Sequence, residues 1–216
     1  MATYESFVKL NGSVGDLVFY NLNGKNIVRK KSGFNKNAFH KSASYEKVRQ
    51  NSSEFGHCSK IGKIIRQCLE VYIKESDDPL LYQKFAKLMT EIKDLDNASE
   101  KGKRTVKSGL ATESGMKMLR NFQFGNIRSL EDTATISAGL WDYGLVLDKN
   151  IVVDEIIIET LRIDFEEYKS EHFKQQIFVE KPMNEYVFQK HFSDEELQFH
   201  FIILKKDDKI IKMGFV

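Results

Sequence analysis

Hydrophobic and polar residues alternate over short distances at the start of the chain, a pattern that predicts β-structure. Residues 3–10 are expected to form a short strand or an extended arm. The run LVFY ends at residue 20, and KNIVRK begins just after Asn23-Gly24. Asn and Gly adopt the positive φ that both central positions of a type I′ turn require. The sequence therefore predicts a β-hairpin. Its turn residues are Gly12, Gly15, Asn23 and Gly24.

From about residue 44 to residue 74, apolar positions recur at spacings of three, four or seven, as in a helix with one apolar face. Ser44 is a suitable N-cap for this helix. Gly56 and Gly62 lie inside it, where each costs about 1 kcal/mol relative to alanine. We therefore expect either close packing or a break near residue 56. The expected apolar stripe consists of Tyr45, Val48, Phe55, Cys58, Ile61, Ile65, Leu69 and Tyr72.

A second helix is predicted to begin with Asp78 as its cap and Pro79 at its first helical position. Its apolar stripe consists of Leu81, Phe85, Leu88, Ile92 and Leu95. The polar segment 96–109 is expected to be a mobile loop, and a short helix is expected around residues 112–121.

After about residue 130 the pattern changes to that of β-strands. The pair Asp207-Asp208 predicts the turn of a terminal hairpin. Short strands with close turns are typical of an antiparallel sandwich, and the pattern contains no βαβ unit of a parallel nucleotide-binding sheet. Strands are expected near residues 134–140, 155–165, 173–180, 185–192, 197–205 and 209–215.

These elements predict an α+β protein with an N-terminal β-hairpin, a helical middle and a C-terminal antiparallel β-sandwich-like domain. A length of 216 residues suits one large domain or two small ones. We expect the boundary between a hairpin and helical region at 1–129 and a β domain at 130–216.

The composition indicates a cytoplasmic protein that does not enter a membrane. No apolar run approaches the roughly 18 residues that span a bilayer, and MATYESFVKL lacks the apolar core of a secretory signal. Cys58 and Cys68 lie about 15 Å apart along one expected helix, too far for a disulfide. Two unbridged cysteines favour a reducing compartment.

The net charge of +2 conceals an uneven distribution. Residues 1–74 hold 13 Lys/Arg and 5 Asp/Glu, whereas residues 130–216 hold 10 and 18. A basic front attracts phosphates or an acidic protein surface, including the acidic part of another copy.

No motif in the sequence predicts catalysis, a metal site or a cofactor. Gly12 to Gly15 is a G-x-x-G turn, and Gly24-Lys25 lacks the other residues of a phosphate-binding loop. The five histidines and two cysteines contain no second pair at zinc spacing. The acidic pairs lie mostly in expected turns and caps. We therefore expect a protein that is not an enzyme.

The basic cluster between residues 24 and 66 is the best functional signal, with eleven Lys/Arg against two acidic residues. Phe34, Phe39 and Tyr45 are interleaved with it and can stack on bases where they are exposed. A solvated basic face, a docking surface for an acidic protein and a phosphate-binding surface remain alternatives. The candidate contact residues are Lys25, Arg29, Lys30, Lys31, Lys36, Lys47, Lys60, Lys63 and Arg66.

The N-terminal region resembles a family of uncharacterised proteins from Bacteroidota. The resemblance covers residues 12–66 and depends on Gly-x-x-Gly-x-Leu-x-Phe-Tyr from Gly12, on Gly24-Lys25, on Val-Arg-Lys-Lys from Val28, and on a helix with Arg49 and Glu54-Phe55-Gly56. It implies a bacterial origin, a hairpin and helix before a C-terminal β-sandwich, and a non-enzymatic role. It supplies no catalytic residue, and segment 96–109 and the acidic C-terminal part depart from it.

We therefore expect a non-catalytic binding or assembly protein whose basic hairpin and helix contact a protein partner or another copy. In an assembly, the edge of the hairpin can pair with a neighbour's sheet. The alternative is a nucleic-acid-binding protein whose residues 25–31 follow the phosphate backbone.

Overall fold

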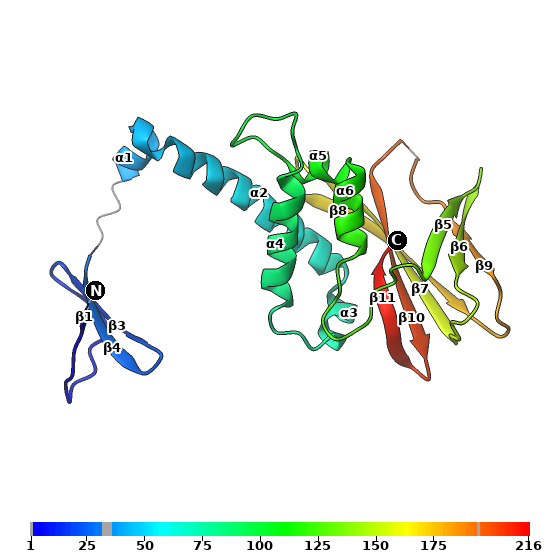
Figure 1. Cartoon of the computed structure of the whole chain (residues 1–216), viewed down its shortest axis with the longest axis horizontal. Coiled ribbons are helices and arrows are strands. Elements are labelled where there is room, and N and C mark those ends of the chain that lie inside the picture. The colour runs from blue at the N-terminus through cyan, green and yellow to red at the C-terminus, as the bar shows by residue number, and fades with distance from the viewer. Residues whose placement is uncertain (1, 32–35, 194) are drawn as a thin grey trace. The chain divides into compact units, whose positions relative to one another are not determined.

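The computed structural model of the chain describes residues 2–31, 36–193 and 195–216 (Figure 1). The chain divides into two compact units, Met1–Arg49 and Gln50–Val216. We call them unit 1 and unit 2 and describe each by itself. The boundary that the sequence suggested between residues 129 and 130 lies inside unit 2.

Unit 1 is a four-stranded antiparallel sheet followed by short helical segments. The predicted hairpin is confirmed, since Asn23 and Gly24 have φ values of 51° and 80° between its strands. Only Thr3 of the segment predicted at 3–10 lies in a strand. The strands, in the order β1-β4-β3-β2, and the helical segments are β1 (Ala2–Thr3), β2 (Gly12–Val14), β3 (Leu17–Leu22), β4 (Lys25–Lys30), α1 (Lys36–Lys41) and the 3-10 turn η1 (Ala43–Tyr45).

Five helices follow, and those predicted from the sequence are present. The predicted start of the second helix is wrong: α4 begins at Leu81, with Leu80 and not Asp78 as its N-cap, because the Asp78 carboxylate accepts the N–H of Leu80 before the first helical turn. Ser42, not Ser44, is the capping residue, because its side chain accepts a hydrogen bond from the Ser44 N–H at the start of η1. The helices are α2 (Glu46–Cys68), α3 (Glu70–Glu75), α4 (Leu81–Lys93), α5 (Val106–Leu110) and α6 (Glu113–Arg120). The first residues of α2, up to Arg49, belong to unit 1.

The predicted stripe of α2 is confirmed from Cys58 onward but is wrong upstream. Val48 is 49% exposed because it lies before the part of α2 that packs into unit 2, which begins at the buried Glu54. Phe55 is 59% exposed because it lies about 100° around the helix from Glu54, at the margin of the buried face. The helix does not break at Gly56 but ends before Leu69, which has a φ of −106°. Gly62 is the position of close packing, since a Cβ there would lie 3.2 Å from the Met89 Cγ atom.

Seven strands build two antiparallel sheets in unit 2. All six predicted strands are present, and Asp207 and Asp208 have positive φ in the terminal turn. The sequence missed β6, which contains Gly144, a residue type depleted in strands. The larger sheet has the order β11-β10-β7-β8 and the smaller one β5-β6-β9. The strands are β5 (Ala134–Ala138), β6 (Asp142–Leu147), β7 (Glu155–Asp164), β8 (Lys169–Phe178), β9 (Glu185–Gln189), β10 (Gln198–Lys206) and β11 (Lys209–Phe215).

The larger sheet is the middle layer of unit 2, between the helices and the smaller sheet (Figure 1). Ile157 and Leu161 of β7 share one buried cluster with the helices, for example with Ile65 and Phe85. Ile156 and Ile158 lie on the opposite face of β7 and belong to a second buried cluster, with residues of β6 and β9. Successive strand residues point to opposite faces, so β7 supports both cores. The architecture is the predicted α+β fold.

The crossing of α5 over α4 depends on a missing side chain. A Cβ on Gly109 would lie 2.0 Å from the Ile92 carbonyl oxygen, so the backbones touch. We expect Gly109→Ala to destabilise unit 2 by about 2 kcal/mol, as overpacking does, in a urea unfolding experiment. Gly56→Ala is the control: nothing lies within 4 Å of that Cβ, and helix propensity should make it neutral or stabilising. Equal urea midpoints of unfolding for the two variants would contradict the close approach of the Gly109 and Ile92 backbones.

Candidate functional site

The hairpin that carries the first candidate residues is fixed by its own turn. The Asn21 Oδ1 atom accepts a hydrogen bond from the Gly24 N–H at 3.0 Å, and the Asn21 and Asn26 side chains lie 3.2 Å apart across the strands. Gly15, also predicted as a turn residue, has a φ of 57° in the turn after β2. Gly12 was predicted as a turn residue too, but it is the first residue of β2, with a φ of 122°, and pairs with Phe19. The local sequence is thus sufficient to shape this part of unit 1.

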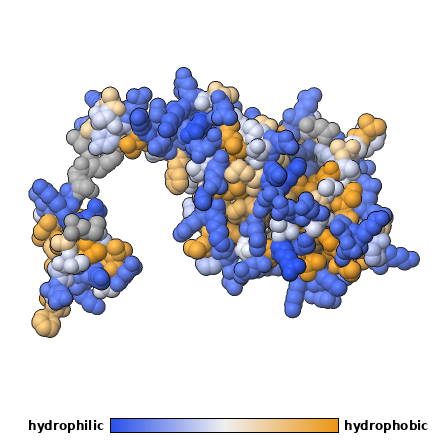
Figure 2. Space-filling model, in the orientation of Figure 1, coloured by the Kyte–Doolittle hydropathy of each residue, from blue (hydrophilic) through white to orange (hydrophobic). Residues whose placement is uncertain are grey.

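The sheet of unit 1 has almost no core. Tyr4 packs edge-on against Phe19 on one face, with ring centroids 5.6 Å apart. Ile27 lies on the other face and is the one buried apolar residue among the described residues of unit 1, at 7% exposure. Many larger apolar side chains reach solvent, and Figure 2 shows apolar patches beside hydrophilic ones on this unit. The exposed set is Phe7, Val8, Leu10, Val14, Leu17 and Leu22, joined by Val48 of α2.

Unit 1 is also strongly cationic. It contains nine Lys/Arg and three Asp/Glu, a net charge of +6. Within the described residues, none of these cations forms an ion pair with a carboxylate. All of these cations are exposed except Arg49, which is half-buried. Its guanidinium donates hydrogen bonds to the Phe39 and Ser42 carbonyls. The exposed candidate residues of this unit are Lys25, Arg29, Lys30, Lys31, Lys36 and Lys47.

These cations occupy both faces of the sheet. Lys25 and Arg29 alternate with Asn26 and Val28 along β4, so they share the face of Ile27. Lys30 lies on the opposite face, with Val28. The Arg29 guanidinium is 6.0 Å from the centroid of the Tyr20 ring, at the outer limit of a cation–π contact. Either face therefore combines apolar groups with positive charge.

The last three candidate residues belong to unit 2, and two of them have partners there. The Lys60 ammonium lies 4.4 Å from the Tyr168 ring centroid. The half-buried Arg66 donates to the Gly62 carbonyl and lies 4.2 Å from the Tyr82 ring centroid. Its partial burial lowers the pKa of Arg66. Lys63 is exposed. Arg66 therefore contributes to the packing of unit 2, whereas Lys60 is exposed like Lys63 and contacts the Tyr168 ring.

The aromatic residues proposed to stack on bases are not displayed for that purpose. Phe39 and Tyr45 are half-buried against each other, with ring centroids 5.9 Å apart. Phe34 lies outside the described residues. The sequence missed Phe7, which protrudes fully from the irregular segment after β1. No spacing marks it, because it lies in neither a strand nor a helix.

A buried carboxylate in unit 2 organises the segment that was expected to be a mobile loop. Glu54 is 3% exposed and accepts hydrogen bonds from the Lys93 ammonium at 2.8 Å, the Arg104 guanidinium at 2.7 Å and the Gly102 N–H at 2.6 Å. The Arg104 hydrogen bonds hold the pKa of Glu54 far below its usual range. Asp96 accepts the Thr105 N–H at the start of α5. Segment 96–109 is therefore fixed to α2.

A second buried carboxylate, that of Glu159, has a raised pKa, in contrast to Glu54. Glu159 of β7 is 4% exposed, and its Oε1 atom accepts the Tyr72 hydroxyl at 2.8 Å. Its Oε2 atom has no hydrogen-bond partner among the described residues. Burial raises the pKa of Glu159, and it also raises the pKa of the nearby Cys68 thiol. The thiol therefore stays protonated at neutral pH and is a poor nucleophile.

No family model, no curated protein and no solved structure matches this chain. The resemblance to the Bacteroidota family therefore stays a prediction. Among the described residues, no helix combines the length and the apolar character needed to cross a membrane.

The Glu54 network makes a prediction about acid stability. Glu54→Gln removes the buried carboxylate from Lys93 and Arg104 and leaves them only the half-exposed Asp94 as a carboxylate partner. We therefore expect a loss of about 2 kcal/mol near pH 7 by urea unfolding. A depressed carboxyl pKa stabilises the fold above the unfolded value of about 4.5 and loses its effect as pH falls below it. The difference between wild type and variant should therefore shrink in acid. A constant difference at all pH values would contradict this role.

The corresponding substitution at the second buried carboxylate, Glu159→Gln, should change the free energy of unfolding in the opposite direction. The raised pKa of Glu159 favours the protonated form, so its contribution is fully present below the unfolded value of about 4.5 and is lost as pH rises. Glu159→Gln keeps an acceptor for Tyr72 and removes the buried charge. We expect it to stabilise the protein by about 1 kcal/mol near pH 7 and to have little effect near pH 4. Destabilisation at neutral pH would show that the ionised carboxylate is needed.

Proposed function

We propose that the chain is a non-catalytic binding or assembly protein, and that unit 1 is its contact module for an acidic protein surface. One observation carries the proposal: a four-stranded sheet with one buried apolar residue, Ile27, exposes apolar side chains and unpaired cations together. A sheet this small is stable by itself only if one of its faces is apolar and covered. The sheet of unit 1 buries little apolar surface, so it gains little stability by itself. A partner that covers the sheet supplies that missing burial.

The kind of exposed side chain favours a protein over a nucleic acid. Valine and leucine predominate in the exposed set, and aliphatic groups gain nothing from phosphates. Nucleic-acid surfaces instead combine cations with stacking aromatics, and Phe39 and Tyr45 are packed together. Among the described residues, the unit 1 cations have no carboxylate partners, which favours an acidic rim on the partner, since opposite charges guide association and exclude wrong partners.

The charge-reversal variant Arg29→Glu, Lys30→Glu and Lys31→Glu tests this function in the full chain. We expect at least about a tenfold loss of affinity for an acidic probe, labelled poly-glutamate, at low salt, with an unchanged thermal transition. Light scattering at low and high salt, with the 260/280 nm absorbance ratio, reports on self-association and bound nucleic acid in the same sample.

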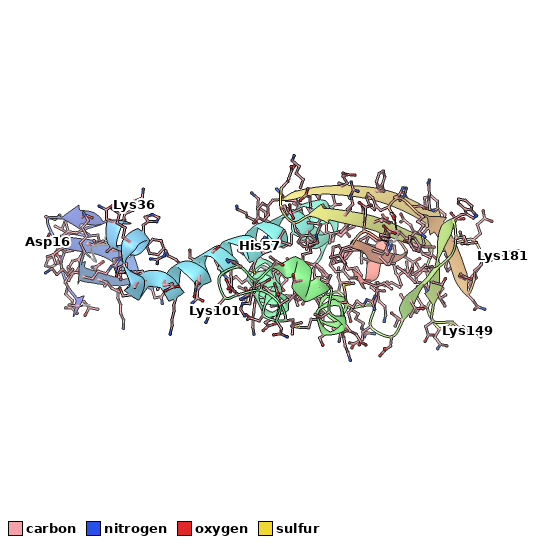
Figure 3. The ribbon with its side chains drawn as sticks, turned by 90° about the horizontal axis from the view of Figure 1, so that it is seen from above. Asp16, Lys36, His57, Lys101, Lys149 and Lys181 are labelled. Carbon is pink, nitrogen blue, oxygen red and sulfur yellow. The ribbon has the colours of Figure 1, made fainter. Side chains whose placement is uncertain are left out.

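A matched control separates the position of the charges from their number. Lys149, Lys181 and Lys209 are exposed in unit 2, so replacing them with glutamate changes the net charge equally; Figure 3 labels two of them. This control should keep its affinity for the probe. Equal losses in both variants would mean that the net charge alone is measured. If the chain binds an RNA oligonucleotide more tightly than poly-glutamate, and the triple variant at residues 29–31 abolishes this binding, the nucleic-acid alternative is favoured.

A further inference from the structure

Strand β8 leaves a long edge of the larger sheet without a neighbouring strand. It is the last strand in the order β11-β10-β7-β8 and pairs with β7 over all ten of its residues without a bulge. In Figure 3 the gold β8 runs along the margin of unit 2. Among the described residues, no backbone hydrogen bond from another segment reaches its outer side. The outward N–H and C=O groups of such an edge are a template for another strand.

The other edges of unit 2 are shorter or covered. At the opposite margin of the same sheet, Arg128 forms a bridge with Lys212 of β11, and its carbonyl accepts the Met213 N–H. The smaller sheet ends in β5 and β9, which have five residues each. Among the described strands of unit 2, β8 therefore offers the longest open edge.

The second half of β8 has the composition of a pairing segment. The residues His172–Phe178 read HFKQQIF, with two phenylalanines, one isoleucine, no proline or glycine, and Lys174 as the one formal charge. Segments of about seven residues with high β-propensity and low charge pair readily. Phe178 is 72% exposed and Phe173 is 42% exposed, so their side chains are open to a neighbour.

Two-fold symmetry restricts how this segment can pair with itself. Facing residues must point to the same side of the sheet, so the axis passes through one residue. An axis at Glu171 or at Lys174 places a charge opposite its own copy, which is unfavourable. An axis at Phe173 places His172 opposite Lys174. These three registers are therefore poor. Axes at His172 and Gln176 also mismatch charged and apolar groups, because they place Glu171 opposite Phe173 and Lys174 opposite Phe178.

An axis at Gln175 gives the register that matches apolar groups with apolar groups. It places Phe173 opposite Ile177 of the second copy and Ile177 opposite its Phe173. Lys174 faces the neutral Gln176, and His172 faces Phe178. Phe173 and Ile177 lie on the face of β8 that borders the smaller sheet, where Phe173 already stacks on His191 at 4.3 Å. Aromatic and β-branched pairs across strands are favourable.

We infer that His172–Phe178 of β8 pairs antiparallel with the same segment of a second copy, about an axis at Gln175. The two larger sheets then form one continuous eight-stranded sheet. Seven facing pairs supply about seven backbone hydrogen bonds, roughly one per pair. Each dimer carries two copies of unit 1, and the inference does not depend on what unit 1 binds.

Disulfide trapping in the full chain tests the register. Gln175→Cys places the two thiols opposite each other across the axis, at a Cα separation near 5 Å that suits a disulfide. Gln176→Cys is the matched control: the neighbouring residue faces Lys174, and its two copies lie too far apart on the diagonal. Under mild oxidation we expect at least fivefold more covalent dimer from Gln175→Cys than from Gln176→Cys or from wild type, which has only Cys58 and Cys68.

Sedimentation of the unmodified chain tests the dimer itself. We expect twice the chain mass of 25.0 kDa, and this mass should persist at high salt because the pairing segment carries little charge. Phe178→Lys should weaken the dimer at least tenfold, whereas Val187→Lys, at a similarly exposed residue of β9, should not. A monomeric wild type, equal cross-linking of the two cysteine variants, or a dimer lost only with the unit 1 charge reversal would overturn the inference.

Discussion

Strand β7 is the element on which unit 2 depends, because it is buried on both faces. Its residues Ile157 and Leu161 pack against the helices, while Ile156 and Ile158 pack against the smaller sheet. It also pairs with β10 on one side and β8 on the other. A strand in this position has little room for polar groups, so Glu159 must pair with Tyr72 and shift its pKa upward.

Local patterns in the sequence were sufficient for the fold class but not for the contacts between distant segments. The β3–β4 hairpin followed from Asn23-Gly24, because that turn is determined by its own two residues. The exposure of Val48 could not be predicted, since periodicity shows which face of a helix is apolar but not where the packed part of it begins. Strand β6 was missed because it contains Gly144, a residue type depleted in strands.

The candidate site shows the same limit. Sequence identified the basic residues, and six of them are exposed in unit 1. It could not show that Arg66 contacts Tyr82 or that Glu54 joins Lys93 and Arg104, because these partners are distant in the sequence. Nor could it show that unit 1 lacks a core, since LVFY is the sequence of an ordinary half-buried strand. Burial depends on what lies above a strand, which its own residues do not encode.

The thin sheet of unit 1 has a calorimetric consequence. Its apolar side chains are hydrated before any encounter, so covering them must give a negative change in heat capacity, which ion pairing alone does not produce. A ligand that recognised only the cations would bind with little such change and with a strong dependence on salt. The temperature dependence of the binding enthalpy thus reports how much of this sheet becomes the interior of a complex.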